Sequence, residues 1–509
     1  MSLAGPSQQT VIDFLARPGT YGGVPVKRID THAATVFLAG DRALKIKRAV
    51  RFPFLDYSTL ERRKAACAAE IAVNQPSAPQ IYRRVVPITR EADGTLAIGG
   101  QGEPVEWAVD MRRFDEMQTL DHLAAAGLID AALADALARA VARAHALAPV
   151  NTDAGFTDEL AEVITQNDAE LGASPELFPP SEVGALTQAT RAAFSRLRPL
   201  LDARERAGLV RRCHGDLHLG NIVLLDGAPV LFDAIEFDPR IATGDVLYDL
   251  AFLLTDLIER GLPQPANTVL NRYLSETRRP EDLDALAALP LFMSLRAAIR
   301  AKVTAARPAQ GAERASISSS ARAYFALAGQ FLLPSLPMLL AVGGLSGTGK
   351  SLLARALAAE ILPSPGAVVL RSDIERKALF NRTETERLPE SAYGREVTAR
   401  VYAALADKAR RIFAAGHSAI VDAVFADSGE RAAIAQAAPA NRFRGLFLTA
   451  DLATRLSRVG GRKGDASDAD AAVARRQERY DLGAMDWTRL DASGTPEETL
   501  HRAKAALGL

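Results

Sequence analysis

Residues 344–351 read Gly-Leu-Ser-Gly-Thr-Gly-Lys-Ser and complete the pattern G-x-x-x-x-G-K-[ST]. Glycines let the backbone wrap around a phosphate, so that peptide N–H groups and the start of the following helix point at it. Lys350 would neutralise the β- and γ-phosphates of a nucleotide, and Ser351 would hold Mg²⁺. The expected nucleotide contacts are Gly344, Ser346, Gly347, Thr348, Gly349, Lys350 and Ser351. A glycine-rich turn without a ligand is the alternative, but the complete spacing between an apolar strand and a helix argues against it.

Two acidic side chains follow later apolar runs in the same half. Asp373, in Arg371-Ser-Asp-Ile-Glu-Arg376, could take the proton from an attacking hydroxyl, and Arg376 could grip a phosphate or carboxylate. Asp422 ends the run Ala419-Ile-Val-Asp and could hold the water shell of Mg²⁺. A helix-capping aspartate followed by a solvated arginine is the plainer alternative for the first pair.

Basic residues flank a stretch of small and charged residues at 460–470. Arg455, Arg458, Arg462 and Lys463 could supply one or two side chains that close over a transferred phosphoryl group, and Arg458 is our candidate nucleotide contact. An exposed basic helix explains each of these residues equally well.

A second, unrelated pattern is His214-x-Asp216-x-x-x-x-Asn221, which has the spacing of a kinase catalytic loop. In such a loop, Asp216 accepts the proton of the acceptor hydroxyl and Asn221 binds Mg²⁺. The apolar run Val230-Leu-Phe then ends in Asp233, where a second metal-binding carboxylate belongs. A polar hairpin in which these residues only shape turns is the alternative. Because residues suited to these three roles follow one another in the expected order, we favour a site that contains a catalytic base and binds a metal.

Two different folds must position these residues. The N-terminal part has β-like runs at 35–38, 43–47 and 105–111 and helical patterns at 58–73, 129–148, 183–206, 245–260, 281–303 and 312–332. Beyond the two prolines of Leu333-Pro-Ser-Leu-Pro337, strands at 338–343, 367–371, 418–422 and 443–448 alternate with helices at 350–361, 395–415 and 428–437. This alternation predicts a parallel sheet with helices on both faces. The main boundary is expected near residue 335.

Residues 338–500 resemble the P-loop small-molecule and polynucleotide kinases, through the loop at 344–351 and Ser372-Asp373-x-x-Arg376. The resemblance implies that Asp373 is the base and that Arg376 contacts a phosphate of the acceptor. It does not identify the acceptor. The additional motifs of remodelling ATPases are not found in this sequence, so an unfoldase is not expected.

Residues 25–305 resemble the aminoglycoside phosphotransferase and choline kinase family, through His214-Gly-Asp-Leu-His-Leu-Gly-Asn221 and Asp245-Val-Leu-Tyr-Asp249. The resemblance implies an α+β, protein-kinase-like bilobal domain, followed by an α/β P-loop domain. The expected bounds are 20–115 for the small lobe, 116–335 for the large lobe, 1–335 for the whole first domain and 336–509 for the second. The resemblance also implies that Asp245 and Asp249 support the catalytic loop structurally. His218 is expected to pack within that loop.

The same resemblance implies a small-lobe lysine for the α- and β-phosphates and a glutamate that holds it. Lys45 and Lys47 alternate onto one face of their strand, and the phasing of the family favours Lys47, with Lys45 nearer the adenine. Glu70 in the following helix is the better partner, although Glu61 competes. No G-x-G-x-x-G pattern precedes these lysines, and only Gly40 lies in the turn.

Further ligand contacts are expected outside these motifs. The run Met111-Arg-Arg-Phe114 resembles the hinge between the lobes, where backbone groups would meet adenine. Arg296 and Arg300 share a helix face and could bind an anionic acceptor, which would favour a phosphorylated or acidic metabolite over an aminoglycoside. A solvated basic stripe is the alternative.

Composition narrows the class of protein. The 509 residues include 61 basic and 61 acidic side chains, a balance that argues against a general nucleic-acid or membrane-surface binder. Cys67 and Cys213, the two cysteines, imply no disulfide framework. Without a signal-peptide pattern or an apolar run of membrane length, a cytoplasmic location is expected.

The leading hypothesis is a bifunctional ATP- and Mg²⁺-dependent kinase. Each domain would transfer a γ-phosphoryl group to a hydroxyl of a small molecule, such as a sugar or nucleoside derivative, and the fusion suggests consecutive reactions. Three alternatives stay open: an aminoglycoside-modifying kinase with a P-loop partner domain, a polynucleotide 5′-kinase activity in the C-terminal domain, and a nucleotide-dependent regulatory switch.

Overall fold

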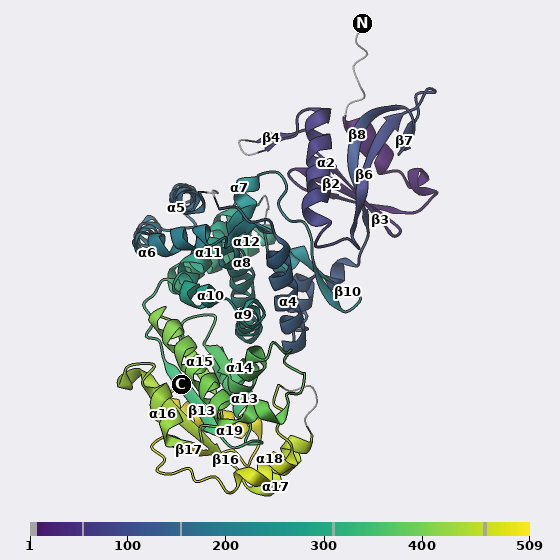
Figure 1. Cartoon of the computed structure of the whole chain (residues 1–509). Coiled ribbons are helices and arrows are strands. Elements are labelled where there is room, and N and C mark those ends of the chain that lie inside the picture. Colours follow the sequence, from purple (N-terminus) through teal and green to yellow (C-terminus); the bar gives the residue numbers. More distant parts are fainter. Residues whose placement is uncertain (1–7, 53–54, 153–154, 308–310, 462–465) are drawn as a thin grey trace. The chain divides into compact units, whose positions relative to one another are not determined.

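The computed structural model describes residues 8–52, 55–152, 155–307, 311–461 and 466–509, which form two compact units. The first contains Met1–Leu160 and Asp202–Asp256, and the second contains Ala161–Leu201 and Leu257–Leu509. The divisions fall inside three helices, namely α5 (Phe156–Gly172), α6 (Pro180–Arg206) and α8 (Val246–Glu259) (Figure 1). The boundary expected near residue 335 lies between α12 (Gly311–Phe331) and β13 (Leu339–Gly344).

A six-stranded antiparallel sheet begins the first unit. Its spatial order is β1 (Val26–Asp30), β2 (Ala34–Ala39), β3 (Arg42–Lys47), β8 (Glu103–Arg112), β6 (Tyr82–Arg90) and β7 (Leu96–Ile98). Side chains alternate between the two faces, so Leu44 and Ile46 pack with α1 (Gln8–Leu15), whereas Ala43 packs with α2 (Leu60–Asn74). Lys45 and Lys47 therefore share the face that α2 covers.

The rest of the first unit is mainly helical. Its remaining helices are α3 (Leu120–Ala125), α4 (Ala131–Leu147) and α7 (Pro239–Ala242). Three two-stranded ribbons complete it: β4 (Arg51–Phe52) with β5 (Leu55–Asp56), β9 (Val210–Arg212) with β12 (Thr243–Asp245), and β10 (Ile222–Leu225) with β11 (Ala228–Leu231). The segments around the last two ribbons carry Asp216, Asn221 and Asp233.

A five-stranded parallel sheet lies in the second unit. Its order is β14 (Val368–Arg371), β15 (Ala419–Asp422), β13, β16 (Phe443–Thr449) and β17 (Thr488–Asp491). The helices of this part are α13 (Lys350–Ala358), α14 (Ser372–Leu379), α15 (Arg395–Ala414), α16 (Ser428–Ala435), α17 (Leu452–Gly460), α18 (Ala471–Gln477) and α19 (Pro496–Leu507). Every residue of β13 and β15 is buried, as expected for parallel strands covered on both faces. The carboxyl ends of three neighbouring strands thus bring together the 344–351 loop, Asp373 and Asp422.

Helices that precede this sheet in sequence belong to the same unit: α9 (Pro263–Thr277), α10 (Pro280–Asp284), α11 (Leu289–Ala305) and α12. The prediction of a single helix at 281–303 was wrong. A short 3₁₀ turn at Ala285–Ala287 separates α10 from α11, because Pro290 can enter only the first turn of a new helix.

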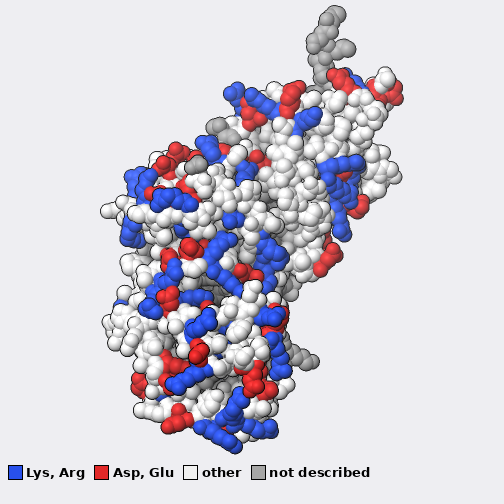
Figure 2. Space-filling model, viewed as in Figure 1, with Lys and Arg blue, Asp and Glu red and all other residues white. Residues whose placement is uncertain are grey.

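No helix in the described part of the chain has the length and apolarity needed to cross a membrane. Basic and acidic side chains are interspersed over the face shown in Figure 2.

Candidate active sites

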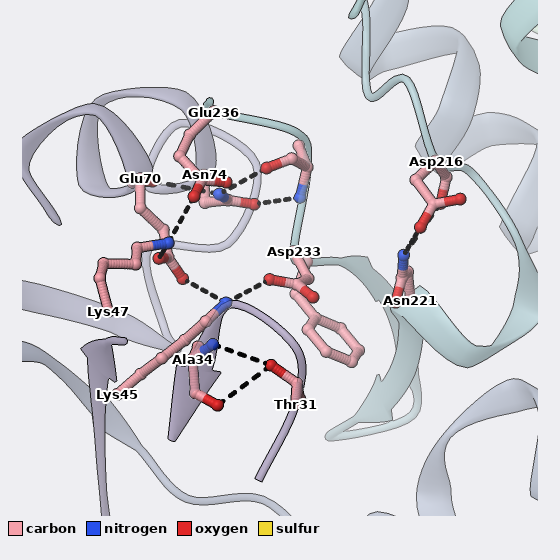
Figure 3. Close-up of polar contacts among 12 residues, drawn as sticks. Thr31, Ala34, Lys45, Lys47, Glu70, Asn74, Asp216, Asn221, Asp233 and Glu236 are labelled. Carbon is pink, nitrogen blue, oxygen red and sulfur yellow. Dashed lines mark hydrogen bonds and ion pairs between the residues drawn. The ribbon is translucent and has the colours of Figure 1, made fainter. Parts of the chain in front are cut away.

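Both lysines of β3 reach the same buried glutamate of α2 (Figure 3). Lys45 Nζ lies 2.9 Å from Glu70 Oε1, and Lys47 Nζ lies 2.5 Å from Oε2. Glu70 is fully buried, whereas the competing Glu61 is exposed. Burial alone would raise the pKa of Glu70, but the two ammonium groups outweigh it and hold that pKa below its ordinary value.

Lys45 also contacts the carboxylate expected to bind metal. Its Nζ lies 2.7 Å from Asp233 Oδ1, and the Asp233 N–H donates to the Tyr82 hydroxyl at 3.1 Å. Asp233 has a φ of 60°, in the left-handed region, which fixes how its side chain leaves the backbone. Burial would raise the pKa of Asp233, but the Lys45 ammonium prevails and lowers it. The carboxylate is therefore kept charged.

Lys47 has a different second partner. It pairs with Glu236, which also accepts a hydrogen bond of 3.0 Å from the Tyr57 hydroxyl. One helical turn after Glu70, Asn74 Oδ1 accepts the Ala234 N–H at 2.7 Å. The segment that follows Asp233 is thus tied to β3 and α2. Sequence reasoning missed Glu236, Tyr57 and Asn74, because only the fold brings them next to the lysines.

The catalytic-loop pattern forms a compact turn. Asn221 Nδ2 donates to the Asp216 carbonyl at 2.9 Å and to Asp216 Oδ2 at 3.1 Å (Figure 3). His214 Nε2 is 2.9 Å from the Phe232 carbonyl, and burial lowers the pKa of this histidine. The Asp216 side chain is 38% exposed. The proposed base is therefore accessible, and the Asn221 carboxamide is oriented through its nitrogen.

Acidic residues of α8 hold this loop. Asp249 Oδ1 accepts the Gly215 N–H at 2.8 Å, and Asp256 accepts the Leu219 N–H at 2.9 Å. Gly215 has a φ of +82° and a Cβ there would lie 3.0 Å from Ala242 Cα, so glycine is needed at this close approach. Asp245, which ends β12, instead accepts two hydrogen bonds from the Arg204 guanidinium.

His218 and the hinge-like run Met111-Arg-Arg-Phe114 were also expected to lie near the N-terminal site. His218 Nδ1 accepts the Gly220 N–H at 3.1 Å, and its ring lies 5.8 Å from that of Phe252. His218 Nε2 is also 3.4 Å from Asp216 Oδ2, a contact that packing alone did not predict. The hinge-like run begins at the end of β8, where the ring of Phe114 meets that of Phe232 at 5.0 Å.

Positive backbone angles shape the loop at 344–351. Gly344, Gly347 and Gly349 have φ values of 139°, 90° and 93°. A Cβ at Gly347 would lie 2.5 Å from the Arg455 carbonyl oxygen, whereas one at Gly349 would meet no atom within 4 Å. The loop therefore packs closely on one side and leaves space at Gly349, as a cradle for phosphate requires.

Three polar groups of this loop form hydrogen bonds with other groups of the chain. The Ser346 N–H donates to Gln477 Oε1 at 2.7 Å, and the Thr348 hydroxyl donates to the Leu345 carbonyl at 2.9 Å. The Lys350 ammonium donates to the same Leu345 carbonyl at 3.2 Å.

The two expected magnesium groups of this half lie together. The Ser351 hydroxyl donates to Asp422 Oδ2 at 2.5 Å. Arg371 donates to both, with its Nε 3.3 Å from Asp422 Oδ2 and its Nη2 3.2 Å from Ser351 Oγ. A hydroxyl and a carboxylate are suitable oxygen ligands for Mg²⁺. The Arg371 guanidinium contacts both and pairs with the Asp422 carboxylate.

Asp373 lines a cavity of about 1340 Å³ together with Lys350, Ser351, Arg376 and Asp422. Burial, and next the nearby Asp422 carboxylate, raise the pKa of Asp373. A carboxylate with a raised pKa beside a phosphate loop fits the role of a general base. Arg376 is buried, donates to the Ala392 carbonyl at 2.7 Å and lies 5.0 Å from the centre of the Tyr393 ring.

The basic residues near 460 divide into three groups. Arg455 is fully buried and donates to the Ser346 carbonyl at 2.9 Å, so it braces the loop, and neither a lid nor an exposed helix describes it. Arg458 lines the cavity and donates to the Ala492 and Gly494 carbonyls at 2.7 and 2.6 Å. Arg462 and Lys463 lie outside the described residues.

The arginine pair expected to meet an anionic acceptor lies on α11. Arg296 is buried, so the two residues do not form a solvated stripe. Arg300 lies over the ring of Tyr324, 5.6 Å from its centre.

Comparisons with known proteins match two separate parts of the chain to families. Residues 34–289, half of the chain, match the model of the phosphotransferase enzyme family, and residues 339–481 match that of an AAA domain. The uncharacterized protein Rv2004c of Mycobacterium tuberculosis is 32% identical over 488 residues, which cover 93% of this chain and 94% of the relative. A protein of Mycobacterium bovis, Mb2027c, matches over the same shares with the same identity.

Solved structures match each part separately. A gluconokinase from Sinorhizobium meliloti is 19% identical with a TM-score of 0.25, and the match covers 34% of this chain and 93% of that one. A choline/ethanolamine kinase family protein from Mesorhizobium loti is 18% identical with a TM-score of 0.36, covering 64% and 98%. An ethanolamine kinase from Plasmodium vivax is 8% identical with a TM-score of 0.38, covering 61% and 86%. The chain belongs to the phosphotransferase enzyme family and is an enzyme in which a P-loop, kinase-like domain follows a phosphotransferase domain.

Proposed function

We propose that the chain contains two ATP- and Mg²⁺-dependent phosphotransfer sites, each acting on a hydroxyl group of a small molecule such as a sugar, nucleoside or related metabolite. The observation that supports the proposal is that each half contains a lysine, oxygen groups suited to a metal and an aspartate, to which we assign phosphate binding, metal binding and the role of base. Basic and acidic residues are balanced, which disfavours a nucleic-acid acceptor.

In the N-terminal site, we assign the phosphate contact to Lys45 and not to Lys47. Lys45 is the lysine that joins Glu70 to Asp233, the carboxylate proposed to bind metal. Lys47 pairs with Glu70 and Glu236. Oxygen atoms of Asp233 and Asn221 would bind Mg²⁺, which would neutralise charge on the phosphates.

Asp216 would act as the base of this site. It would accept the proton of the acceptor hydroxyl while that oxygen forms a bond to the γ-phosphorus and the bond to the ADP oxygen breaks. The contacts of Asp249 and Asp256 with the loop keep Asp216 in place for this step.

In the P-loop site, the backbone around Gly349 and the Lys350 ammonium would hold the phosphates, while Ser351 and Asp422 would hold the metal and its waters. Asp373 would accept the acceptor's proton. Its raised pKa makes it a stronger base than an ordinary aspartate. The cavity of about 1340 Å³ is large enough for a nucleotide and a second small molecule.

The proposal is tested by mass spectrometry of a metabolite extract incubated with Mg²⁺-ATP and the unaltered chain, Asp216→Ala or Lys350→Ala. We expect new ions, heavier than a parent by one phosphoryl group, that disappear with only one of the two substitutions. An ion that requires both residues would indicate consecutive phosphorylation. If none of the three proteins forms a new ion, the small-molecule proposal is wrong, and a nucleotide-dependent switch becomes the better account.

A further inference from the structure

Strand β14, which leads directly to Asp373, lies at the edge of the parallel sheet. It pairs with β15 on one side, where the Val368 N–H donates to the Ser418 carbonyl at 2.9 Å. The backbone groups of successive residues in a strand point to opposite sides, so those of Ala367 and Val369 face away from β15. Their N–H and C=O groups need other partners.

The Ala367 N–H donates to the Ala358 carbonyl of α13 at 2.7 Å, and a side chain of α9 supplies partners for the Ala367 carbonyl and the Val369 N–H. Asn271 Oδ1 accepts the Val369 N–H at 2.6 Å, and its Nδ2 donates to the Ala367 carbonyl at 3.1 Å. One residue of a parallel neighbouring strand would make this same pair of bonds, donating to one carbonyl and accepting from the amide two residues later. The carboxamide of Asn271 therefore substitutes for one residue of a sixth strand.

The contact is closely fitted. Asn267, one helical turn before Asn271 and buried, also donates to the Ala367 carbonyl, at 3.0 Å. Gly366 has a φ of +113°, and a Cβ there would lie 2.7 Å from Asn267 Nδ2 and 2.4 Å from the Ala358 carbonyl oxygen. Only glycine allows this approach of α9 to the strand.

Helix α9 also holds the chain beyond α14. Arg272 pairs with Glu384, and the Ser275 hydroxyl donates to Glu384 Oε1 at 3.1 Å. The carbonyl of Glu384 accepts from Lys377 of α14 at 2.6 Å, and Lys377 lies 3.2 Å from Asp468, which lines the cavity. Residues 367–384, here named the acceptor segment, are thus fixed to α9 at both ends.

We propose that α9 is a positioning element for the P-loop site, which aims Asp373 by completing the edge of its sheet. Helix α9 lies within residues 34–289, which match the phosphotransferase family, and in the same compact unit as the parallel sheet, so a segment matched to the first family would build part of the acceptor site of the P-loop domain. The inference rests on the proposed role of Asp373 as the base. It implies that Asn271 and Arg272 act on phosphoryl transfer without touching the substrate.

The test compares Asn271→Leu, which removes both strand-like bonds at similar volume, with Arg272→Ala, which releases the other end. Gln264→Leu is the matched control, because Gln264 is an exposed α9 residue whose side chain donates to the Ala356 carbonyl in α13 rather than to the acceptor segment. Each change is made in the full chain carrying Asp216→Ala, so that only the P-loop site can act. Amide hydrogen exchange is followed by mass spectrometry in peptides covering 366–376 and 344–352, and Lys350-dependent product formation is followed in the metabolite extract at varied ATP.

We expect Asn271→Leu to speed exchange in 366–376 by about 30-fold, the factor that two lost hydrogen bonds predict. Product should form several times more slowly with an unchanged half-saturating ATP concentration, and exchange in 344–352 should not change. Arg272→Ala should have a smaller effect in the same direction, and Gln264→Leu should have none.

Three results would overturn the inference: unchanged exchange in 366–376 with both α9 variants, faster exchange without slower transfer, or a parallel rise in half-saturating ATP that signals general loosening of the domain. The hydrogen-exchange measurement requires no phosphoryl acceptor, so it tests the inference separately from the proposed function. If no Lys350-dependent product forms with the starting protein, the proposed function fails. Unchanged exchange in 366–376 would still refute the positioning of the acceptor segment by α9.

Discussion

The two sites hold charge in opposite ways. In the N-terminal site, Lys45 and Lys47 are neutralised by Glu70, Asp233 and Glu236, so the charged groups stabilise one another before any ligand is bound. In the P-loop site, positive backbone angles shape the loop proposed to bind phosphate, and burial together with the nearby Asp422 carboxylate raises the pKa of Asp373. In the first site the charged side chains form ion pairs with one another. In the second site, ionisation of the buried Asp373 carboxyl costs stability.

The difference follows from how each site is assembled. The N-terminal site draws side chains from β3, α2, the catalytic loop and the end of β11, and side-chain ion pairs fix their positions. The P-loop lies within eight consecutive residues, and a single strand-to-helix turn orients it. Ion pairs between distant segments order the N-terminal site, whereas backbone geometry orders the phosphate loop, in which the Lys350 ammonium donates to the Leu345 carbonyl.

The largest effects should separate the two sites. Asp216→Asn and Asp373→Asn should each slow transfer at their own site by at least about 100-fold, because each removes a general base, and leave the other site unchanged. Site-specific products in the metabolite extract and binding of a fluorescent ATP analogue are the measurements. If either substitution preserves transfer, or if it acts by abolishing nucleotide binding, the aspartate is not the base of that site.

Next in size is the difference between the two β3 lysines. Lys45→Met should weaken ATP binding and slow N-terminal transfer by about 10- to 100-fold, as loss of a charged phosphate contact predicts. Lys47→Met should act less strongly, through looser packing of the Glu236 segment. ATP titrations of both variants in a Lys350→Ala background decide between them. A larger loss with Lys47→Met would return the phosphate contact to Lys47.

The pH dependence should also distinguish the P-loop site. Asp373 must be deprotonated to accept a proton, and its pKa is raised, so kcat/KM for Lys350-dependent transfer should fall on the acid side at a higher pH than an ordinary aspartate, near 4, would give. Rates measured from pH 4 to 8 in a buffer of constant ionic strength would show this limb. A profile that stays flat down to pH 4 would exclude Asp373 as a base with a raised pKa.

The smallest effects should be opposite changes in stability at pH 7. For Asp373, whose folded pKa is raised, the stabilising protonated form is lost as pH rises through that pKa, so Asp373→Asn should raise Tm. For Asp233, whose folded pKa is lowered, the charged form stabilises the fold at neutral pH, so Asp233→Asn should lower Tm. Calorimetry should show shifts of a few degrees at most, and the same sign for both would contradict the comparison.

Sequence patterns predicted the two folds because both rest on local signals. The glycine spacing at 344–351, the alternation of strands and helices beyond it, and the Asp216–Asn221 spacing each depend on neighbouring residues. The parallel sheet and the antiparallel small-lobe sheet confirm the expected fold class. Strand β6, with a proline and three arginines, and the 15-residue helix α9 were missed because their patterns are weak.

Contacts between distant segments could not be predicted in this way. Both β3 lysines lie on one face, as alternation requires, but only the position of Asp233 distinguishes Lys45 from Lys47. Arg371, Glu236 and Asn271 carry no motif, and each acquires its role from a neighbour at least 50 residues away in sequence.

The central claim is that one chain holds two nucleotide sites, and the number of nucleotides bound tests it most directly. Titration calorimetry with Mg²⁺ and a non-hydrolysable ATP analogue should give two bound per unaltered chain, one with Lys350→Ala and one with Asp233→Ala. A single bound nucleotide in the unaltered chain, lost entirely on substitution at either position, would contradict the account.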